Sequence, residues 1–115
     1  MSNSKDKVFE MRTYTTHEGK LQDLHDRFRE HSIEILSRHG MESVAYWVPE
    51  DPELSNNTLI YIITHESRDI AEENWQSFFD DPEWQRVYEE SHADGPLVDE
   101  VESVFMKATP YSPLQ

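Results

Sequence analysis

Three side chains that can bind or protonate a small molecule occupy alternate positions near the start of the chain. Glu10, Arg12 and Tyr14 alternate with apolar or small residues in the segment 8–14. This period of two is typical of a β-strand, so the three side chains are expected on one face of a sheet. A guanidinium binds carboxylates or phosphates bidentately, a carboxylate orients the guanidinium or acts as a base, and a phenol donates a proton or hydrogen bond. The residue types therefore predict an anion-binding pocket.

The same residues have a structural interpretation. Glu10 and Arg12 carry opposite charges, and buried ion pairs occur at subunit interfaces as well as in binding sites. A row of acid, guanidinium and phenol is unusual on a sheet face that packs against helices. We therefore expect it on the face without helices, inside a barrel formed by two sheets, as either a pocket or an interface pair.

Other parts of the chain are expected to add side chains to this face. Tyr61 and His65 share one phase of the strand predicted at 58–65, and Phe105 and Lys107 belong to the last predicted strand. His31 borders the apolar stripe of the first predicted helix. It is either a pocket residue or a polar residue satisfied where the helix meets the sheet.

The histidines do not form a metal-binding pattern. His25, His31 and His39 lie on the first predicted helix, and spacings of six and eight residues point them about 120° and about 80° apart. No His-x-x-x-His motif is present, and the chain contains no cysteine. We therefore expect neither a metal nor a cofactor. His39, directly before Gly40, is interpreted as a partner of the helix C-terminal dipole.

The elements that would position these residues form two strand–helix–strand units. Strands are predicted at 8–14, 42–48, 58–65 and 98–107, a helix at 21–39, and a second helical region at 67–92 that breaks at Asp80-Asp81-Pro82. In that second region, Trp75 and Trp84 are interpreted as core aromatic residues. Two such units joined by a hairpin-length loop match the ferredoxin-like α+β fold, with a four-stranded antiparallel sheet and both helices on one face.

This arrangement leaves the other face of the sheet uncovered. We expect that face to be semi-polar and aromatic, and a homodimer that packs sheet on sheet would cover it. The predicted organisation is a disordered N-terminus at 1–7, one domain at 8–109 and a C-terminal tail at 110–115.

Composition restricts the possible partners. The 115 residues carry a formal net charge of −14, which disfavours nucleic acid and anionic membrane surfaces because both are bound through basic residues. High-salt adaptation also produces such a surface. The longest apolar run, Leu59–Ile63, is too short to span a membrane. Residues 1–7 lack the pattern of a signal peptide, so a cytoplasmic location is expected.

Several motifs resemble the NIPSNAP family. They are Val8–Thr15, Gly19-Lys20-Leu21, Arg27–His31, Arg38–Met41, Tyr46-Trp47, Trp75 and Asp81–Trp84. The resemblance covers nearly the whole domain and implies a dimeric α+β barrel in which the sheets of two ferredoxin-like protomers face each other. The biochemical activity of this family is poorly defined. Its wider superfamily resembles haem-degrading and antibiotic-synthesis monooxygenases, which is an analogy of fold.

Two functions are therefore considered. The first is binding of a small, anionic molecule in a barrel pocket, with the chain acting as a cofactor-independent monooxygenase- or isomerase-like enzyme if it is catalytic. The candidate pocket residues are Glu10, Arg12, Tyr14, His31, Tyr61 and His65. The second is a non-catalytic dimeric interaction module. A cavity on which these side chains converge would favour the first function, and a sealed interior would favour the second.

Overall fold

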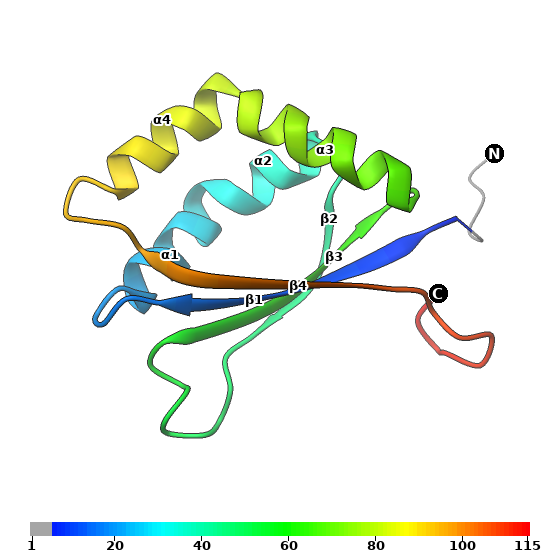
Figure 1. Cartoon of the computed structure of the whole chain (residues 1–115), viewed down its shortest axis with the longest axis horizontal. Helices are drawn as coiled ribbons and strands as arrows, with labels where there is room; N and C mark the ends of the chain where they lie inside the picture. The colour runs from blue at the N-terminus through cyan, green and yellow to red at the C-terminus, as the bar shows by residue number, and fades with distance from the viewer. Residues whose placement is uncertain (1–5) are drawn as a thin grey trace.

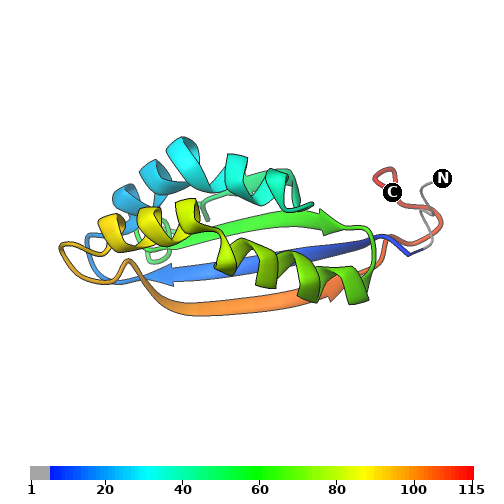
Figure 2. The ribbon, with the colours of Figure 1, turned by 90° about the horizontal axis from the view of Figure 1, so that it is seen from above.

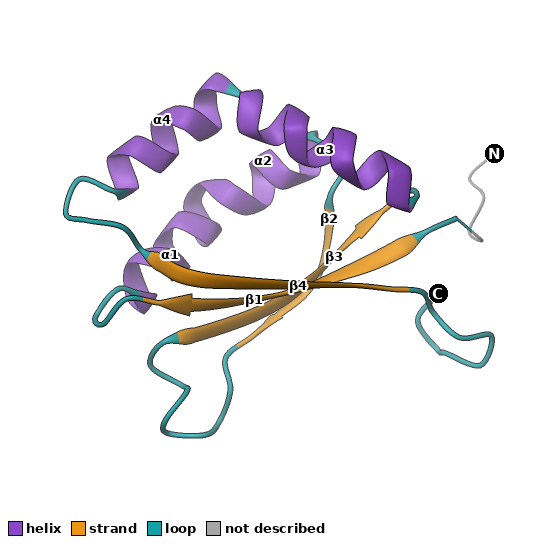
Figure 3. Cartoon of the chain, viewed as in Figure 1, coloured by secondary structure: helices purple, strands orange, loops and turns teal. Residues whose placement is uncertain are grey.

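The computed structural model describes residues 6–115, so residues 1–5 of the expected disordered N-terminus lie outside it. The strands are β1 (Val8–Thr16), β2 (Glu42–Trp47), β3 (Thr58–His65) and β4 (Val98–Met106), and the helical segments are α1 (Leu21–Arg27), η1 (Phe28–Ser32), α2 (Ile33–Arg38), α3 (Arg68–Asp80) and α4 (Pro82–Ser91). The strands pair antiparallel in the order β2-β3-β1-β4, and the helices cover one face (Figure 1, Figure 3). This confirms the predicted ferredoxin-like α+β fold.

The first helical region is continuous but irregular. A π-helical turn, η1, joins α1 to α2, and the backbone N–H of Ile33 donates to the carbonyl of Phe28, five residues earlier. Around this turn both Arg27 and Phe28 are buried, at 7% and 6% exposure. A regular helix would turn consecutive side chains about 100° apart. Mid-helix π turns occur frequently at functional sites, and this one directly follows the buried cation Arg27.

Capping side chains, a proline and a glycine set the boundaries of the helical regions. The first ends at Gly40, whose φ is +80°, a left-handed conformation that suits glycine. The Ser67 hydroxyl accepts a hydrogen bond from the backbone of Ile70 and caps α3. Asp81 accepts one from the backbone of Glu83 and caps α4, with Pro82 in the first turn. The predicted break at Asp80-Asp81-Pro82 is therefore the bend between α3 and α4.

The strand register assigns each side chain to a face. Arg12 lies opposite Tyr61 on the face that the helices cover, whereas Met11 lies opposite Ile62 on one side and Val104 on the other, on the uncovered face. Figure 2 shows both helical regions stacked above the sheet. The uncovered face was expected to be semi-polar and aromatic. It is instead largely apolar at its centre, because the polar and aromatic phase of the strands points toward the helices.

The ends of the described chain lie at the same end of the molecule (Figure 1). The side-chain amine of Lys7 donates a hydrogen bond to the main-chain oxygen of Gln115, at 2.9 Å. Within residues 6–115, no helix is long and apolar enough to cross a membrane.

Candidate functional site

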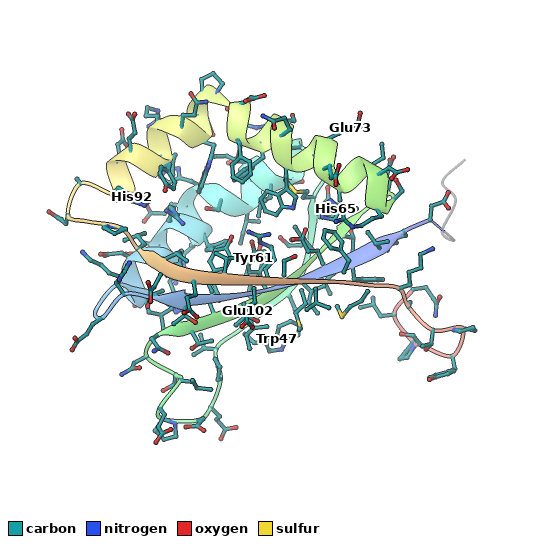
Figure 4. The ribbon with its side chains drawn as sticks, in the orientation of Figure 1. Trp47, Tyr61, His65, Glu73, His92 and Glu102 are labelled. Atoms are coloured by element: carbon teal, nitrogen blue, oxygen red, sulfur yellow. The ribbon has the colours of Figure 1, made fainter. Side chains whose placement is uncertain are left out.

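The site is organised around the carboxylate of Glu10, which is 1% exposed. One oxygen, Oε1, is 2.8 Å from both His65 Nε2 and Trp75 Nε1. The other, Oε2, accepts hydrogen bonds from Arg12 Nη1 at 2.8 Å and Ser103 Oγ at 2.7 Å. These donors come from β3, α3, β1 and β4, so one carboxylate ties three strands to a helix. Figure 4 shows His65 in the layer between the sheet and the helices.

The electrostatics of Glu10 disfavour a role as a general base near neutral pH. Burial by itself raises the pKa of this carboxyl. The hydrogen bonds from His65, Ser103, Trp75 and Arg12 outweigh that effect and lower the pKa from 4.5 to about 2. A base poised for catalysis needs a pKa near the working pH. Glu10 therefore acts as an anchor that orients Arg12 and Trp75.

The row of Glu10, Arg12 and Tyr14 faces the helices, which corrects the expectation that it would face the interior of a barrel. The Arg12 guanidinium lies over the ring of Trp75 on α3, 4.3 Å from its centroid. The Tyr14 ring contacts Phe28 of η1, with centroids 5.9 Å apart. The expectation failed because these polar groups satisfy one another, which removes the desolvation cost that should keep them out of a helix–sheet layer.

Arg12 also organises a pair of phenols. Its Nε donates to the hydroxyl of Tyr61 at 2.9 Å, and its Nη2 donates to that of Tyr14 at 3.2 Å. The two hydroxyls are themselves hydrogen bonded at 2.9 Å. Burial and then the neighbouring Tyr14 raise the pKa of Tyr61 well above its ordinary value, so this phenol keeps its proton.

A cleft opens beside these groups, between β1 and β4 on one side and α3 and α4 on the other. It has a volume of about 630 Å³ and continues into an inner cavity of about 50 Å³. Arg12, Tyr14, Arg27 and Trp84 line both spaces. Such a volume accommodates a small organic molecule, and Arg12 and Tyr14 of the polar row belong to its lining.

Arg27 is the cation that sequence reasoning did not select. Only its Nη1 forms a hydrogen bond, to Ser91 Oγ at 3.1 Å, while the buried Nε lacks a partner among the described residues. No carboxylate in the described chain forms an ion pair with it; instead it lies near the rings of Trp84 and Tyr88. Burial lowers the pKa of this guanidinium, yet arginine remains charged in proteins.

The other predicted residues do not all lie at the cleft. The ring of Phe105 packs on that of His65, and Lys107 lies beyond the end of β4. His31 is separated from the cleft. It lines an acidic groove of about 300 Å³ between the first helical region and α4, together with residues such as Asp23 and Glu90. Within residues 6–115, no three side chains of the metal-binding types are placed to share an ion.

The sequence contains signals for two site residues that were not predicted as such. Trp75 was interpreted as a core aromatic, yet it is only partly buried and its indole N–H is committed to Glu10. Arg27 falls between Leu24 and Phe28 in the apolar stripe of the first helix. A cation at a position that the helical period assigns to the core is a detectable signal. The π turn that follows Arg27 was not predictable from the period.

Comparison with known proteins identifies the family. A model of the NIPSNAP family matches residues 9–113. The chain belongs to the NIPSNAP family. This confirms the resemblance carried by the sequence motifs. A search of curated protein sequences finds no significant match.

Solved structures agree with this assignment. A NIPSNAP family protein of unknown function from Agrobacterium tumefaciens is 27% identical, with a TM-score of 0.80 over 95% of this chain and 94% of that chain. A second NIPSNAP protein from the same organism is 25% identical, with a TM-score of 0.81 over 95% and 99%. SnoaB, described as a cofactor-independent oxygenase from Streptomyces nogalater, is 15% identical, with a TM-score of 0.60 over 94% and 98%. The likeness to SnoaB shows a shared fold alone.

Proposed function

We propose that this NIPSNAP protein binds a small organic anion in the cleft between its sheet and helices. The observation that carries the proposal is the buried guanidinium of Arg27, which lines the cleft. Its Nε has no hydrogen-bond partner, and it forms no ion pair with a carboxylate in the described chain, although Arg27 also lines the acidic groove that contains Asp23 and Asp26. An unpaired buried charge destabilises a fold by several kcal/mol, roughly 3–5 where one partner of a pair is removed. A bound anion would supply the missing charge and the acceptor for Nε.

The cleft walls indicate what the rest of the ligand is like. Phe79, Trp84 and Tyr88 offer aromatic surface, whereas Glu89 and Asp99 also belong to the lining and are exposed. Aromatic walls favour a flat or apolar body. The two carboxylates repel a ligand with several negative charges. A monoanion on an aromatic or apolar frame therefore fits best.

A direct test uses benzoate as the probe and tryptophan fluorescence as the signal, because Trp84 lines the cleft. Benzoate is expected to quench this fluorescence saturably, and uncharged benzamide is expected to bind at least about tenfold more weakly, as a charge-assisted hydrogen bond implies. Arg27→Met should reduce benzoate affinity by about tenfold or more. The same change should leave the free energy of unfolding unchanged or increase it, because an unpaired buried charge is removed.

Arg86→Met is the matched control. Arg86 lies on α4 and is not part of the cleft lining; its side chain is 57% exposed and pairs with Glu90. Its removal should change neither binding nor stability by more than about 0.5 kcal/mol. Equal binding of benzoate and benzamide, or undiminished benzoate binding by Arg27→Met, would contradict the proposal.

If the protein is an enzyme, the site supports chemistry on a substrate that is already ionised. The hydrogen-bond donors Arg12, Tyr14 and Arg27 line the cleft, while the Glu10 carboxylate is saturated with donors and is held at low pKa. Such a set stabilises an oxyanion and does not remove a proton from carbon. A cofactor-independent oxygenase-like reaction of a phenolate or enolate suits it better than an isomerisation that needs a strong base. The shared fold with SnoaB is compatible with this preference.

The uncovered sheet face favours a second candidate function, that of a dimeric interaction module. Met11, Ile60 and Ile62 lie at its centre and are partly accessible, and Trp47 and Val104 are about half exposed, at 48% and 49%. Apolar patches of this kind mark interaction sites. We propose a second copy of the chain as the occupant, and a homodimer is compatible with ligand binding because the cleft opens on the opposite face of the sheet.

A further inference from the structure

The two phenols beside Arg12 have one hydrogen more than the described residues can accept. Each hydroxyl oxygen accepts an N–H of Arg12, and a single O–H lies in the bond between Tyr14 and Tyr61. The phenol that accepts in that bond therefore keeps its own O–H without an acceptor within residues 6–115. The position of this spare hydrogen decides what the site offers to a ligand.

Burial distinguishes the two possible arrangements. Tyr61 is 1% exposed and lines only the inner cavity, whereas Tyr14 lines both that cavity and the wide cleft. An unsatisfied O–H on Tyr61, labelled in Figure 4 between the sheet and the helices, would remain buried. Leaving a buried donor unpaired costs about 1–3 kcal/mol. The favoured arrangement therefore has Tyr61 donating to Tyr14, and Tyr14 free to donate into the cleft.

From this geometry we propose that Tyr14 is the donor to an oxyanion of the ligand, which makes phenolates and enolates the preferred ligand class. This inference rests on the proposed function, because it places the ligand in the same cleft. In this arrangement Arg12 Nη2 and the Tyr61 hydroxyl both donate to the Tyr14 oxygen. These two hydrogen bonds polarise the O–H of Tyr14 that points into the cleft. Arg27, in the same lining, supplies the opposite charge.

The probe for this inference is 4-nitrophenol, whose visible absorbance distinguishes its ionised from its neutral form. Wild-type protein is expected to bind the ionised form preferentially and to lower the apparent pKa of the bound probe by about one unit, equivalent to a tenfold preference. Tyr14→Phe should reduce this shift to the part that Arg27 supplies and weaken binding of the ionised form by about tenfold. Tyr61→Phe should have a smaller effect, roughly threefold, because it removes polarisation but not the donor.

Tyr46→Phe is the matched control. The Tyr46 ring stacks on Tyr61, and its hydroxyl is hydrogen bonded to Ser43, away from the cleft lining. It should bind the probe as the wild type does, and its behaviour tests whether loss of any phenol in this layer disturbs the site. Thermal unfolding of all the variants confirms that they are folded at the assay temperature.

The outcomes separate the two proposals. A larger effect of Tyr61→Phe than of Tyr14→Phe would overturn the inference, since it would place the spare hydrogen on Tyr61. Wild-type binding of benzoate without preference for ionised 4-nitrophenol would overturn it too, while leaving anion binding intact. Absence of binding of both probes would overturn the proposed function and the inference together. A pKa shift of the probe that is reduced specifically in Tyr14→Phe supports both.

Discussion

For Glu10 and Arg12, the structure contains elements of both interpretations that the sequence left open, a binding pocket and a structural ion pair. They form an ion pair in which Arg12 Nη1 and Glu10 Oε2 are 2.8 Å apart. Both residues belong to β1 of one chain, and their side chains lie between the sheet and the helices. Arg12 is 14% exposed at its side chain and also lines the cleft. Burial works against its charge, yet Tyr14, Tyr61 and Glu10 raise the pKa of Arg12. The ion pair therefore fixes the position of a permanent cation, which holds Tyr14 in the cleft lining and Tyr61 in the inner cavity.

The low pKa of Glu10 predicts a specific acid sensitivity. Its pKa is about 2 in the folded protein against 4.5 ordinarily. As the pH falls below 4.5, the unfolded chain takes up a proton that the folded chain does not, so the contribution of Glu10 is complete above about pH 5 and is lost toward pH 2. The pKa difference corresponds to a contribution of about 3 kcal/mol.

Urea denaturation of wild type and Glu10→Gln between pH 6 and pH 3 would measure this contribution. The wild type should be more stable at pH 6, and the difference should shrink as the pH falls. Glu73→Gln, on the exposed face of α3, serves as the control and should give a small difference at all pH values. A wild-type advantage that stayed constant with pH would show that Glu10 is not held ionised by its donors.

At the scale of elements, the bend between α3 and α4 is held by one side chain. Asp81 Oδ1 accepts from the Glu83 backbone at 2.8 Å, and Oδ2 is hydrogen bonded to His39 Nε2 at 2.7 Å and Arg38 Nη2 at 3.1 Å. His39, expected to interact with its own helix dipole, therefore joins the end of the first helical region to this bend. Both helices that meet at the bend contribute walls to the cleft.

Asp81→Ala should therefore cost more than the loss of a helix cap. We expect about 2 kcal/mol for Asp81→Ala and about 1 kcal/mol for Ser67→Ala, which removes only the cap of α3, as measured by urea denaturation. Benzoate binding should weaken about threefold in Asp81→Ala alone, because the bend sets the spacing of the aromatic walls. Equal stability losses in the two variants would contradict a role for Asp81 in joining the first helical region to the bend.

Local patterns were sufficient to predict the elements, and long-range contacts decided the rest. A nearly continuous apolar run predicted the strand Thr58–His65 with its observed bounds, and the Asp81-Pro82 step predicted the helix break. The side of the sheet on which Arg12 lies was predicted wrongly. That side depends on whether Trp75 and His65, distant in sequence, satisfy Glu10, which no local pattern reports. The π turn after Arg27 was not predicted for the same reason, because helix irregularities of this kind are decided by tertiary packing.

At the scale of the whole molecule, the apolar centre of the uncovered face favours dimer formation, whereas the negative charge opposes it. The formal net charge is −14, and Glu42, Glu100 and Glu102 lie in the same phase of β2 and β4 as the apolar centre of the uncovered face. In Figure 4, Trp47 and Glu102 lie on the side of the sheet away from the helices. Two copies packed through this face would bury apolar area and would bring like charges together around it.

These opposing terms predict a homodimer that salt strengthens. Light scattering at micromolar concentration should give twice the chain mass of 13.6 kDa, and raising the salt concentration should lower the dissociation constant by screening the glutamates. Ile62→Glu, at the centre of the face, should yield monomer because it buries an unpaired charge in the interface. Ile33→Glu, 37% exposed on α2, introduces the same charge on the helical side and should stay dimeric. A monomeric wild type, or dissociation of both variants alike, would contradict a sheet-to-sheet dimer.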